Sequence, residues 1–358
     1  VVTVGDTGRA LLDLAGAWRA RQPARVVAVT GSCGKTTVKD MTAAVLRAAT
    51  GEGILATPGN LNNTVGLPLT LLGLREGHAY AAVEVGINRP GEMAFLAGAA
   101  RPDVAVLTNA GPAHLEGLGT VDRVAAEKAG LLAGLGPEGI AVINADSPYA
   151  GDWAGAAPGP VLRYGLEAPA EITGRWQPEG DGGRLWIRVP GEEAEVRLPV
   201  PGQHNASNAL AAVAAGIALG LPLGALAQGL AGIEPPRGRL QVRETGSGRV
   251  VLDDTYNANP ASLEAALAVL TRGIGRTWLV LGDMGELGPE GAEWHRHAGE
   301  RARVDGVDTL LAVGELAVAA AEGFGPEARR LADWREAAEV LEAESAAGDR
   351  ILVKGSRS

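Results

Sequence analysis

The feature that most constrains the fold is a short apolar strand that leads into a glycine-rich turn and then a helix. Residues 25–30 (RVVAVT) are predicted to form a buried strand, and a helical stretch begins after the turn and runs to about residue 49. Such a turn directs backbone N–H groups and a helix N-terminus at an anion, which makes it a cradle for phosphate. The turn reads Gly31-Ser32-Cys33-Gly34-Lys35-Thr36-Thr37.

The order of residues in this turn favours a nucleotide over a plain structural turn. Lys35 is placed to reach the outer phosphates, and the Thr36 hydroxyl is placed to bind Mg²⁺. The strict phosphate-loop pattern has glycine six positions before the lysine, where this chain has Val29. The motif is therefore a shortened variant, G-x-x-G-K-T-T, and the alternative is a glycine-rich turn without a ligand.

Two further strands are predicted to end beside this turn. Residues 80–85 (YAAVEV) form a strand with Glu84 near its carboxyl end, and residues 103–108 (DVAVLT) form another, followed by a loop with His114. In a parallel α/β sheet the carboxyl ends of the strands share one edge, where ligands bind. We therefore expect Lys35, Thr36, Glu84 and His114 to converge around a cation on triphosphate oxygens. The alternatives are a glutamate that faces water from an edge strand and a surface histidine.

Lysine and asparagine are scarce, and their few positions are clustered near motifs. The chain has four lysines, Lys35, Lys39, Lys128 and Lys354, and 28 arginines. Because lysine is a compact charge whose amine can be deprotonated and modified, its scarcity suggests that Lys128, on a predicted helix, has a role. Seven of the ten asparagines fall in three groups, which are Asn60/Asn62/Asn63, Asn205/Asn208 and Asn257/Asn259.

The middle of the chain extends the first domain. Residues 139–144 form another strand, and residues 145–203 suggest a small antiparallel excursion, with alternating stretches at 184–189 and 194–200. Asn205 or Ser207 could cap the helix that follows, or the amides of this segment could read a purine edge. The uncharged stretch 209–227 contains Pro222 and Gly224, so we interpret it as two buried helices and not as a membrane span.

A second α/β pattern restarts after residues 235–238. Strands are predicted at 249–254, 277–281, 309–313 and 351–353, with helical segments between them. Polar residues follow the ends of these strands: Asp253, Asp254, Asp283 and Lys354-Gly355-Ser356-Arg357. We therefore expect an α/β protein with a mostly parallel central ATPase domain at 23–234 and a C-terminal Rossmann-like domain at 235–358.

Composition excludes several classes of protein. A net charge of −10 argues against a general binder of nucleic acid or of an anionic membrane, since both need a basic surface. A single cysteine rules out a disulfide framework and a cysteine-based zinc site. The start of the chain shows no signal-peptide pattern, so we expect a cytoplasmic protein. We also expect a monomer without a nucleic-acid or membrane partner.

The motifs together resemble the Mur ligase family, over nearly the whole chain. Within the family, the resemblance is to the members that add D-alanyl-D-alanine. The phosphate loop and the HNxxN pattern at 204–208 are general to the family, whereas GNLNN, YNANP, GDMGELG and KGSR together are more specific to that branch. The matching blocks are TGSCGKTT (30–37), TPGNLNNTVGLP (57–68), EVGINRPGE (84–92), TNAGPAHLE (108–116), GQHNASN (202–208), DDTYNANP (253–260), LGDMGELG (281–288) and KGSR (354–357).

The resemblance implies an activity: an ATP-dependent ligase that joins D-alanyl-D-alanine to UDP-N-acetylmuramoyl-tripeptide through an acyl phosphate. It also implies that residues 1–22 are the tail of an N-terminal substrate domain that this chain lacks. Gly130 departs from the family, since many relatives carry glutamate there.

The resemblance also implies roles for individual residues. Lys35 would hold the β- and γ-phosphates, Thr36 and Glu84 one Mg²⁺, and His114 a second Mg²⁺. Lys128 matches a lysine that is often carbamoylated to N6-carboxylysine. The nucleotide-binding set would be Gly31, Ser32, Cys33, Gly34, Lys35, Thr36, Thr37, Asn205, Asn208, Arg239 and Asp254, and the substrate-binding set Asn60, Asn62, Asn63, Tyr256, Asn257, Ser356 and Arg357.

Two alternative functions remain open from the sequence. One is a related ligase with another amino donor, of the folylpolyglutamate or cyanophycin type, against which the GNLNN and YNANP blocks argue. The other is a nucleotide-binding module without catalytic activity.

Overall fold

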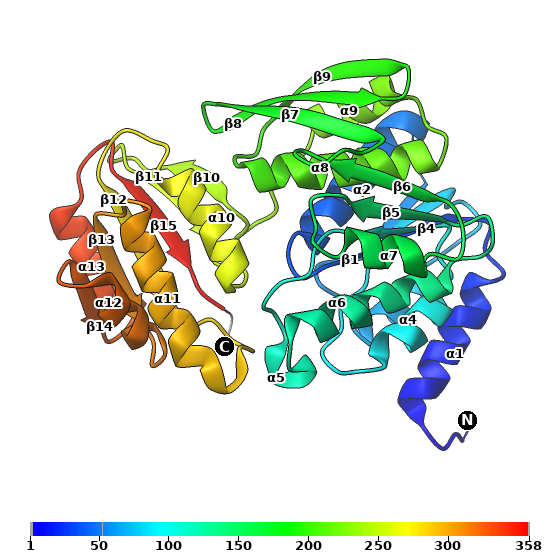
Figure 1. The fold of residues 1–358 in the computed structure, drawn as a ribbon, viewed down its shortest axis with the longest axis horizontal. Helices are drawn as coiled ribbons and strands as arrows, with labels where there is room; N and C mark the ends of the chain where they lie inside the picture. Colours follow the sequence, from blue (N-terminus) through cyan, green and yellow to red (C-terminus); the bar gives the residue numbers. More distant parts are fainter. Residues whose placement is uncertain (1–2, 52, 357–358) are drawn as a thin grey trace. The chain divides into compact units, whose positions relative to one another are not determined.

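The computed structural model describes residues 3–51 and 53–356, which form two compact units. The first unit contains residues 3–51, 53–111, 120–199 and 203–233, and the second contains residues 112–119, 200–202 and 234–356. The elements of each unit are coloured by sequence in Figure 1.

The first unit is built on one nine-stranded sheet. In sheet order, the neighbouring strands from β2 through β3, β1, β4, β5 and β6 to β7 are parallel to one another. Beyond β7, strand β8 pairs antiparallel with β7, and β9 pairs antiparallel with β8. The antiparallel excursion predicted for residues 145–203 is thus confirmed for β7, β8 and β9, which extend the main sheet, whereas β6 in the same segment runs parallel and was not predicted. In sheet order the strands are β2 (Ile54–Ala56), β3 (Tyr80–Glu84), β1 (Arg25–Thr30), β4 (Val104–Leu107), β5 (Ile140–Asn144), β6 (Val161–Gly165), β7 (Ile172–Glu179), β8 (Gly182–Val189) and β9 (Glu192–Leu198).

Helices cover both faces of this sheet. The chain moves one way along the sheet from β1 to β2 and the other way from β3 to β4, so right-handed connections put α2 and α4 on opposite faces. Figure 1 shows α8 on one face and α4 and α6 on the other. The helices are α1 (Thr7–Arg19), α2 (Lys35–Thr50), α3 (Gly66–Leu72), α4 (Glu92–Ala100), α6 (Val121–Ala129), η1 (Gly130–Gly134), α7 (Ala150–Ala156), α8 (Gln203–Ala218) and α9 (Leu223–Ala231).

The core of this unit is made of small aliphatic side chains. Residues 26–29 of β1 and 104–107 of β4 are fully buried valine, alanine and leucine. This composition is expected for parallel strands that are covered on both faces. The apolar stretch 209–227 forms parts of α8 and α9, as predicted, and none of the helices in the described part of the chain is long and apolar enough to cross a bilayer.

The second unit is a six-stranded sheet that is parallel except for one edge strand. Its order places β15, the last strand in the chain, at the centre. The strands are β10 (Gln241–Glu244), β11 (Val250–Asp254), β15 (Arg350–Lys354), β12 (Thr277–Gly282), β13 (Thr309–Val313) and β14 (Ala328–Leu331), and the helices are α5 (Leu115–Leu118), α10 (Pro260–Leu270), η2 (Gly288–Glu290), α11 (Gly291–Val304), α12 (Ala317–Phe324) and α13 (Trp334–Glu344).

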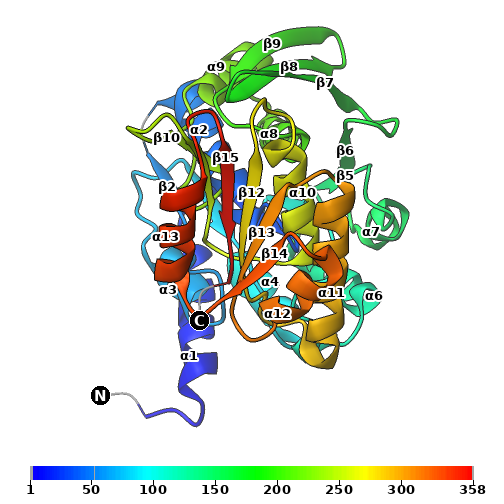
Figure 2. The same cartoon turned by 90° about the vertical axis from the view of Figure 1, so that its left-hand side faces the viewer.

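Two apolar clusters hold this sheet, one on each face. The larger cluster includes residues of α10, α11 and α12, and the smaller one includes Ala337, Val340 and Leu341 of α13. Figure 2 shows α13 on the opposite side of the strands from α10 and α11. The predicted α/β fold, with mostly parallel sheets, is confirmed for both units.

Candidate active site

The predicted phosphate turn joins β1 to α2 and is held by contacts that leave no room for larger side chains. A Cβ atom on Gly31 would lie 1.9 Å from the Thr108 hydroxyl oxygen, so only glycine fits. Gly34 has φ = 81°, which is left-handed backbone, and it caps α2 without any side-chain hydrogen bond. The N-terminus of a sixteen-residue helix therefore opens onto the turn, as an anion site requires.

Asn109 fixes the shape of the turn from the end of β4. Its Oδ1 accepts a hydrogen bond from the Cys33 backbone N–H at 2.9 Å, and its Nδ2 donates to the Cys33 carbonyl at 3.1 Å. Ser32 is tied to the same loop, because its Oγ accepts from the Gly111 N–H at 2.9 Å. Asn109 was not among the predicted site residues, although the TNAGPAHLE block contains it.

Lys35 is the first residue of α2 and is half-buried. Its Nζ donates to the carbonyl oxygens of Gly31 at 2.8 Å and Ser32 at 3.4 Å. The ammonium therefore lies over the turn. A positive charge beside a helix N-terminus can bind the phosphate groups of a nucleotide.

Glu84 is almost completely buried at the end of β3, where it meets the first turn of α2. Its side chain is 2 % exposed, and its Oε2 accepts from the Thr36 hydroxyl at 2.7 Å. Its Oε1 accepts from the Asn62 Nδ2 at 2.7 Å. Since β3 lies between β2 and β1, the alternative of an edge-strand glutamate that faces water is wrong.

This arrangement fits a hard cation. A buried carboxylate is costly unless a positive charge compensates it, and within the described part of the chain Glu84 has only neutral hydrogen-bond donors and no ion pair. A carboxylate and a hydroxyl are oxygen ligands of the kind that Mg²⁺ takes from a protein, with phosphates and waters completing its shell. Residues 3–51 and 53–356 contain no group of three His, Cys, Asp or Glu side chains that could hold a metal ion unaided.

His114 belongs to the second unit and precedes α5. It adopts left-handed backbone with φ = 58°, and its Nδ1 lies 2.6 Å from a carboxylate oxygen of Glu286. The expectation that His114 converges with Lys35 and Glu84 on metal ions stays a prediction.

Lys128 is a buried lysine on α6. It is 1 % exposed, and its Nζ has no hydrogen-bond partner among the described atoms. Burial lowers the pKa of the Lys128 ammonium well below its usual value, and the nearby Lys35 charge lowers this pKa further. Three of the four lysines, Lys39, Lys128 and Lys354, are at most 3 % exposed, so most of the scarce lysines are buried.

Asn205 and Asn208 lie in the first turns of α8, beside the phosphate turn. Both are inside the helix, so the alternative that Asn205 caps it is wrong. The Asn208 Nδ2 donates to the Asn205 Oδ1 at 3.1 Å. A Cβ atom on Gly34 would lie 2.5 Å from the Asn208 Oδ1, which shows how closely this amide approaches the turn.

The asparagines of the segment 57–63 differ in their surroundings. Asn60 is exposed, whereas Asn62 is half-buried against Glu84. The Asn63 Oδ1 accepts from the backbone N–H groups of Val65 and Gly66 at 3.1 and 2.9 Å, which orders the start of α3.

Within the second unit, buried Lys354 holds two of the predicted loops. Its Nζ donates to a carboxylate oxygen of Asp254 and, at 3.0 Å, to the Asn257 carbonyl. The other oxygen of Asp254 accepts from the Leu240 N–H at 3.1 Å. The neighbouring Arg239 guanidinium stacks 4.1 Å above the Tyr256 ring.

Ser356 joins the ends of three strands of this unit. Its Oγ donates to the Asn257 Oδ1 and accepts from the Gly285 N–H, both at 2.9 Å. Arg357, which was also predicted to bind substrate, lies outside the described residues.

His295 was missed by the sequence reasoning. It is fully buried on α11, where its Nδ1 donates to the Gly291 carbonyl and its Nε2 accepts from the Met284 N–H at 2.8 Å. It thereby anchors the LGDMGELG loop. Its sequence context, EWHRHAGERAR, indicates an exposed polar helix, so no local signal could have found it.

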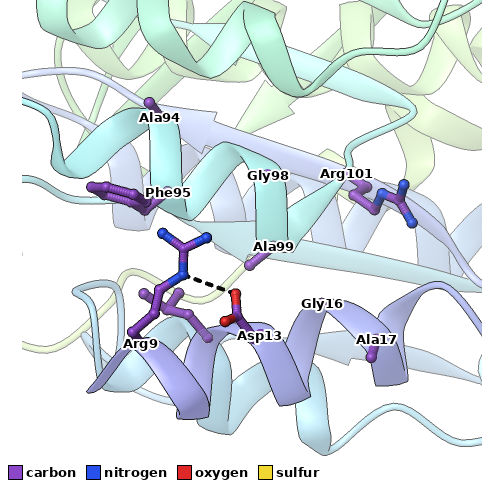
Figure 3. Close-up of a pocket in the computed structure, with 10 residues that line it drawn as sticks. Arg9, Asp13, Gly16, Ala17, Ala94, Phe95, Gly98, Ala99 and Arg101 are labelled. Carbon is purple, nitrogen blue, oxygen red and sulfur yellow. Dashed lines mark hydrogen bonds and ion pairs between the residues drawn. The ribbon is translucent and has the colours of Figure 1, made fainter. Parts of the chain in front are cut away.

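A surface pocket of about 340 Å³ lies between α1 and α4, away from all of these residues (Figure 3). Arg9 in its wall pairs with Asp13 at 3.0 Å and stacks 4.9 Å from the Phe95 ring. The Arg9 guanidinium is thus paired with a residue of the same pocket wall. None of the predicted site residues lines the pocket.

The chain matches two family models that together cover most of its length. Residues 29–216 match the Mur ligase middle domain, and residues 238–357 match the Mur ligase glutamate ligase domain.

Curated relatives named UDP-N-acetylmuramoyl-tripeptide–D-alanyl-D-alanine ligase match the chain end to end. The Escherichia coli (strain K12) protein is 40% identical over 99% of this chain and 79% of its own length. The Bacillus subtilis (strain 168) protein is 36% identical over 100% of this chain and 78% of its own length.

Solved structures of the same kind of ligase are also similar to this chain. MurF from Acinetobacter baumannii superimposes with a TM-score of 0.93 at 33% identity, covering 99% of this chain and 79% of that one. MurF ligase from Thermotoga maritima in complex with ADP gives 0.88 at 30% identity, covering 99% and 82%. A folylpolyglutamate synthase from Mycobacterium tuberculosis, complexed with ADP, shares the fold at 0.78 but only 21% of the sequence, over 98% and 91%. From its two domain matches and these relatives, the chain belongs to the Mur ligase family.

Proposed function

We propose that this chain uses ATP to form the amide bond between D-alanyl-D-alanine and UDP-N-acetylmuramoyl-tripeptide, a step of peptidoglycan synthesis. The observation that carries the proposal is the match, over nearly all of the chain, to relatives named for that reaction, at up to 40% identity. The geometry at the start of α2 supports the ATP half of the reaction, because a helix N-terminus, Lys35 and a buried acid lie together there. Since ATP is the energy source, we place the reaction in the cytoplasm.

The proposed reaction has two steps. The terminal carboxylate of the tripeptide attacks the γ-phosphorus of ATP, which gives an acyl phosphate and ADP. The amine of D-alanyl-D-alanine then attacks the acyl carbon, and phosphate leaves with the C–O bond electrons. In the first step Lys35 and the N-terminus of α2 stabilise the negative charge on the transferring group.

Thr36 and Glu84 are the residues that we propose to hold Mg²⁺. The cation would neutralise phosphate charge when bound. Glu84 supplies one carboxylate oxygen beside the Thr36 hydroxyl, and burial of this pair excludes competing water. His114 is proposed to serve a second Mg²⁺, as the family resemblance implies.

We propose that Lys128 carries a carbamate. Its ammonium is buried without a partner among the described residues, and its lowered pKa favours the neutral amine that attacks CO₂. The neutral amine forms an N–C bond to CO₂ and releases one proton, so a neutral side chain becomes an anion; starting from the ammonium, two protons leave. That anion would compensate the nearby Lys35 charge and support the metal site.

The remaining residues keep their proposed roles. Asn205 and Asn208 would face the adenine, and Arg239 and Asp254 the γ-phosphate and ribose. Contacts to the peptide substrates are proposed for Asn60, Asn62, Asn63, Tyr256, Asn257, Ser356 and Arg357.

Phosphate release tests the proposed function. Release should require ATP, UDP-N-acetylmuramoyl-tripeptide and D-alanyl-D-alanine together, and glutamate should not replace the dipeptide. Hydroxylamine in place of the dipeptide should trap the acyl phosphate as a hydroxamate. Phosphate release with glutamate would support a ligase with another amino donor. If the protein binds ATP but releases no phosphate with any acceptor, it is a non-catalytic nucleotide-binding module.

A further inference from the structure

Asn62 is linked to Glu84 more directly than its predicted role in substrate binding requires. Its Nδ2 lies 2.7 Å from the Glu84 Oε1. An ionised carboxylate can only accept hydrogen bonds, so it is the NH₂ group of the amide that faces it. Glu84 is 2 % exposed, and water therefore cannot easily replace this donor.

The backbone around Asn62 holds its amide in this position. The Gly86 N–H donates to the Asn62 carbonyl at 2.9 Å, so the segment lies against the end of β3. A Cβ atom on Gly86 would come within 2.9 Å of the Asn62 amide carbon, so only glycine permits this approach. Thr57, earlier in the segment, accepts from the Glu84 N–H at 2.9 Å.

A buried lysine fixes the other end of the segment. The Lys39 Nζ donates to the Thr57 carbonyl at 3.1 Å, and Lys39 is 3 % exposed. Lys39 was noted only for its rarity in the sequence. The segment 57–62 is thus attached at both ends to the elements that carry Thr36 and Glu84, namely α2 and β3.

We infer that Asn62 is a positioning residue for Glu84, which sets the affinity of the proposed magnesium site. Each carboxylate oxygen accepts one hydrogen bond of 2.7 Å, and the Asn62 amide on Oε1 fixes the rotation of the carboxylate that keeps Oε2 beside the Thr36 hydroxyl, the other proposed ligand. Partners of this kind behind a metal ligand change metal affinity by about 10- to 100-fold. The inference rests on the proposed function, because it requires that Glu84 binds Mg²⁺ with ATP.

The test measures nucleotide binding as well as turnover. ATP binding is followed by calorimetry with EDTA and then across a Mg²⁺ titration, for the wild type, N62A and N60A. For N62A we expect unchanged ATP binding in EDTA and a Mg²⁺ midpoint raised about 10-fold or more. Turnover of N62A should recover as Mg²⁺ is raised, which a merely structural defect would not show. Asn60 is the matched control for Mg²⁺ binding, since it is exposed and its backbone carbonyl, which accepts from the Asn62 N–H, is kept in alanine.

The outcomes separate the inference from the proposed function. If the wild type binds ATP without any Mg²⁺ dependence, the proposed function fails. If the wild type responds to Mg²⁺ and N62A has the same midpoint, or N62A loses ATP binding in EDTA as well, the inference is overturned. Should N62A not fold, N62S, which keeps only a shorter donor, replaces it, and a midpoint within twofold of the wild type overturns the inference.

Discussion

Replacement of Lys128 by methionine should stabilise the first unit while it abolishes turnover. The wild-type side chain is 1 % exposed and its Nζ has no partner among the described atoms. Methionine has similar length and fills the same space without a charge. Replacing a buried charge by a well-packed apolar side chain changes stability by about zero to +4 kcal/mol, and an unpartnered charge belongs at the favourable end.

The stability difference between K128M and the wild type should depend on pH. Burial lowers the pKa of Lys128 in the folded protein, whereas in the unfolded chain the amine keeps its usual pKa of about 10.4. Between these two values the unfolded state binds one more proton, so wild-type stability rises with pH. The advantage of K128M should therefore shrink as pH rises, by at most about 1.4 kcal/mol per pH unit.

Urea unfolding of both proteins at pH 6 to 9, in buffers purged of CO₂, measures this difference. Contributions of all other titrating groups cancel in the comparison. Bicarbonate should then stabilise the wild type and leave K128M unchanged, since only the lysine forms a carbamate. A stability difference that does not vary with pH, or a K128M protein several kcal/mol less stable than the wild type, would refute the reasoning.

Three further substitutions have defined outcomes. K35A should lose phosphate release yet keep the wild-type circular dichroism spectrum, because the half-buried ammonium donates to the Gly31 and Ser32 carbonyls of its own turn and is not part of the apolar core; unchanged release would contradict the assignment. G31A should cost about 1–3 kcal/mol in thermal unfolding, since its Cβ would meet Thr108 at 1.9 Å, and a melting temperature equal to the wild type would be evidence against this packing. The pKa of His295 is lowered by burial, so wild-type stability should fall as pH drops below about 6.5, where the unfolded chain gains a proton. H295Q, which keeps an acceptor for the Met284 N–H, should lack that fall in urea titrations from pH 7.5 to 5, and an equal slope in both proteins would exclude His295 as its source.

The sequence predicted those parts of the fold that have local signals. The strand, turn and helix around Lys35 are encoded by consecutive residues, and so are the apolar helices after residue 203. The three-residue strand β2 and the four-residue strands β10 and β14 were missed, because such short segments have no periodicity and form only by pairing with neighbours.

Predictions about the site were limited by what depends on tertiary contact. The approach of Glu84 to Thr36 was expected because the carboxyl ends of parallel strands share one edge, but the hydrogen bond from the Asn62 amide to Glu84 could not be inferred from spacing. Lys35 is the first residue of α2 and its side chain folds back over the turn, a conformation that depends on the folded turn and has no signal in the sequence. The burial of Lys128 was suggested only by the rarity of lysine.

The extension of the first sheet through β8 to β9 leaves an open edge. A strand at an edge offers unpaired backbone groups to any other strand, which is a route to aggregation. The sequence of β9, EEAEVRL, places acids along this edge, and Glu193 and Glu195 are paired with Arg188 and Arg184 of β8. An incoming strand would have to displace these pairs and approach a row of like charges. We therefore expect the charged residues of β9 to act as gatekeepers against edge-to-edge pairing between copies of this chain.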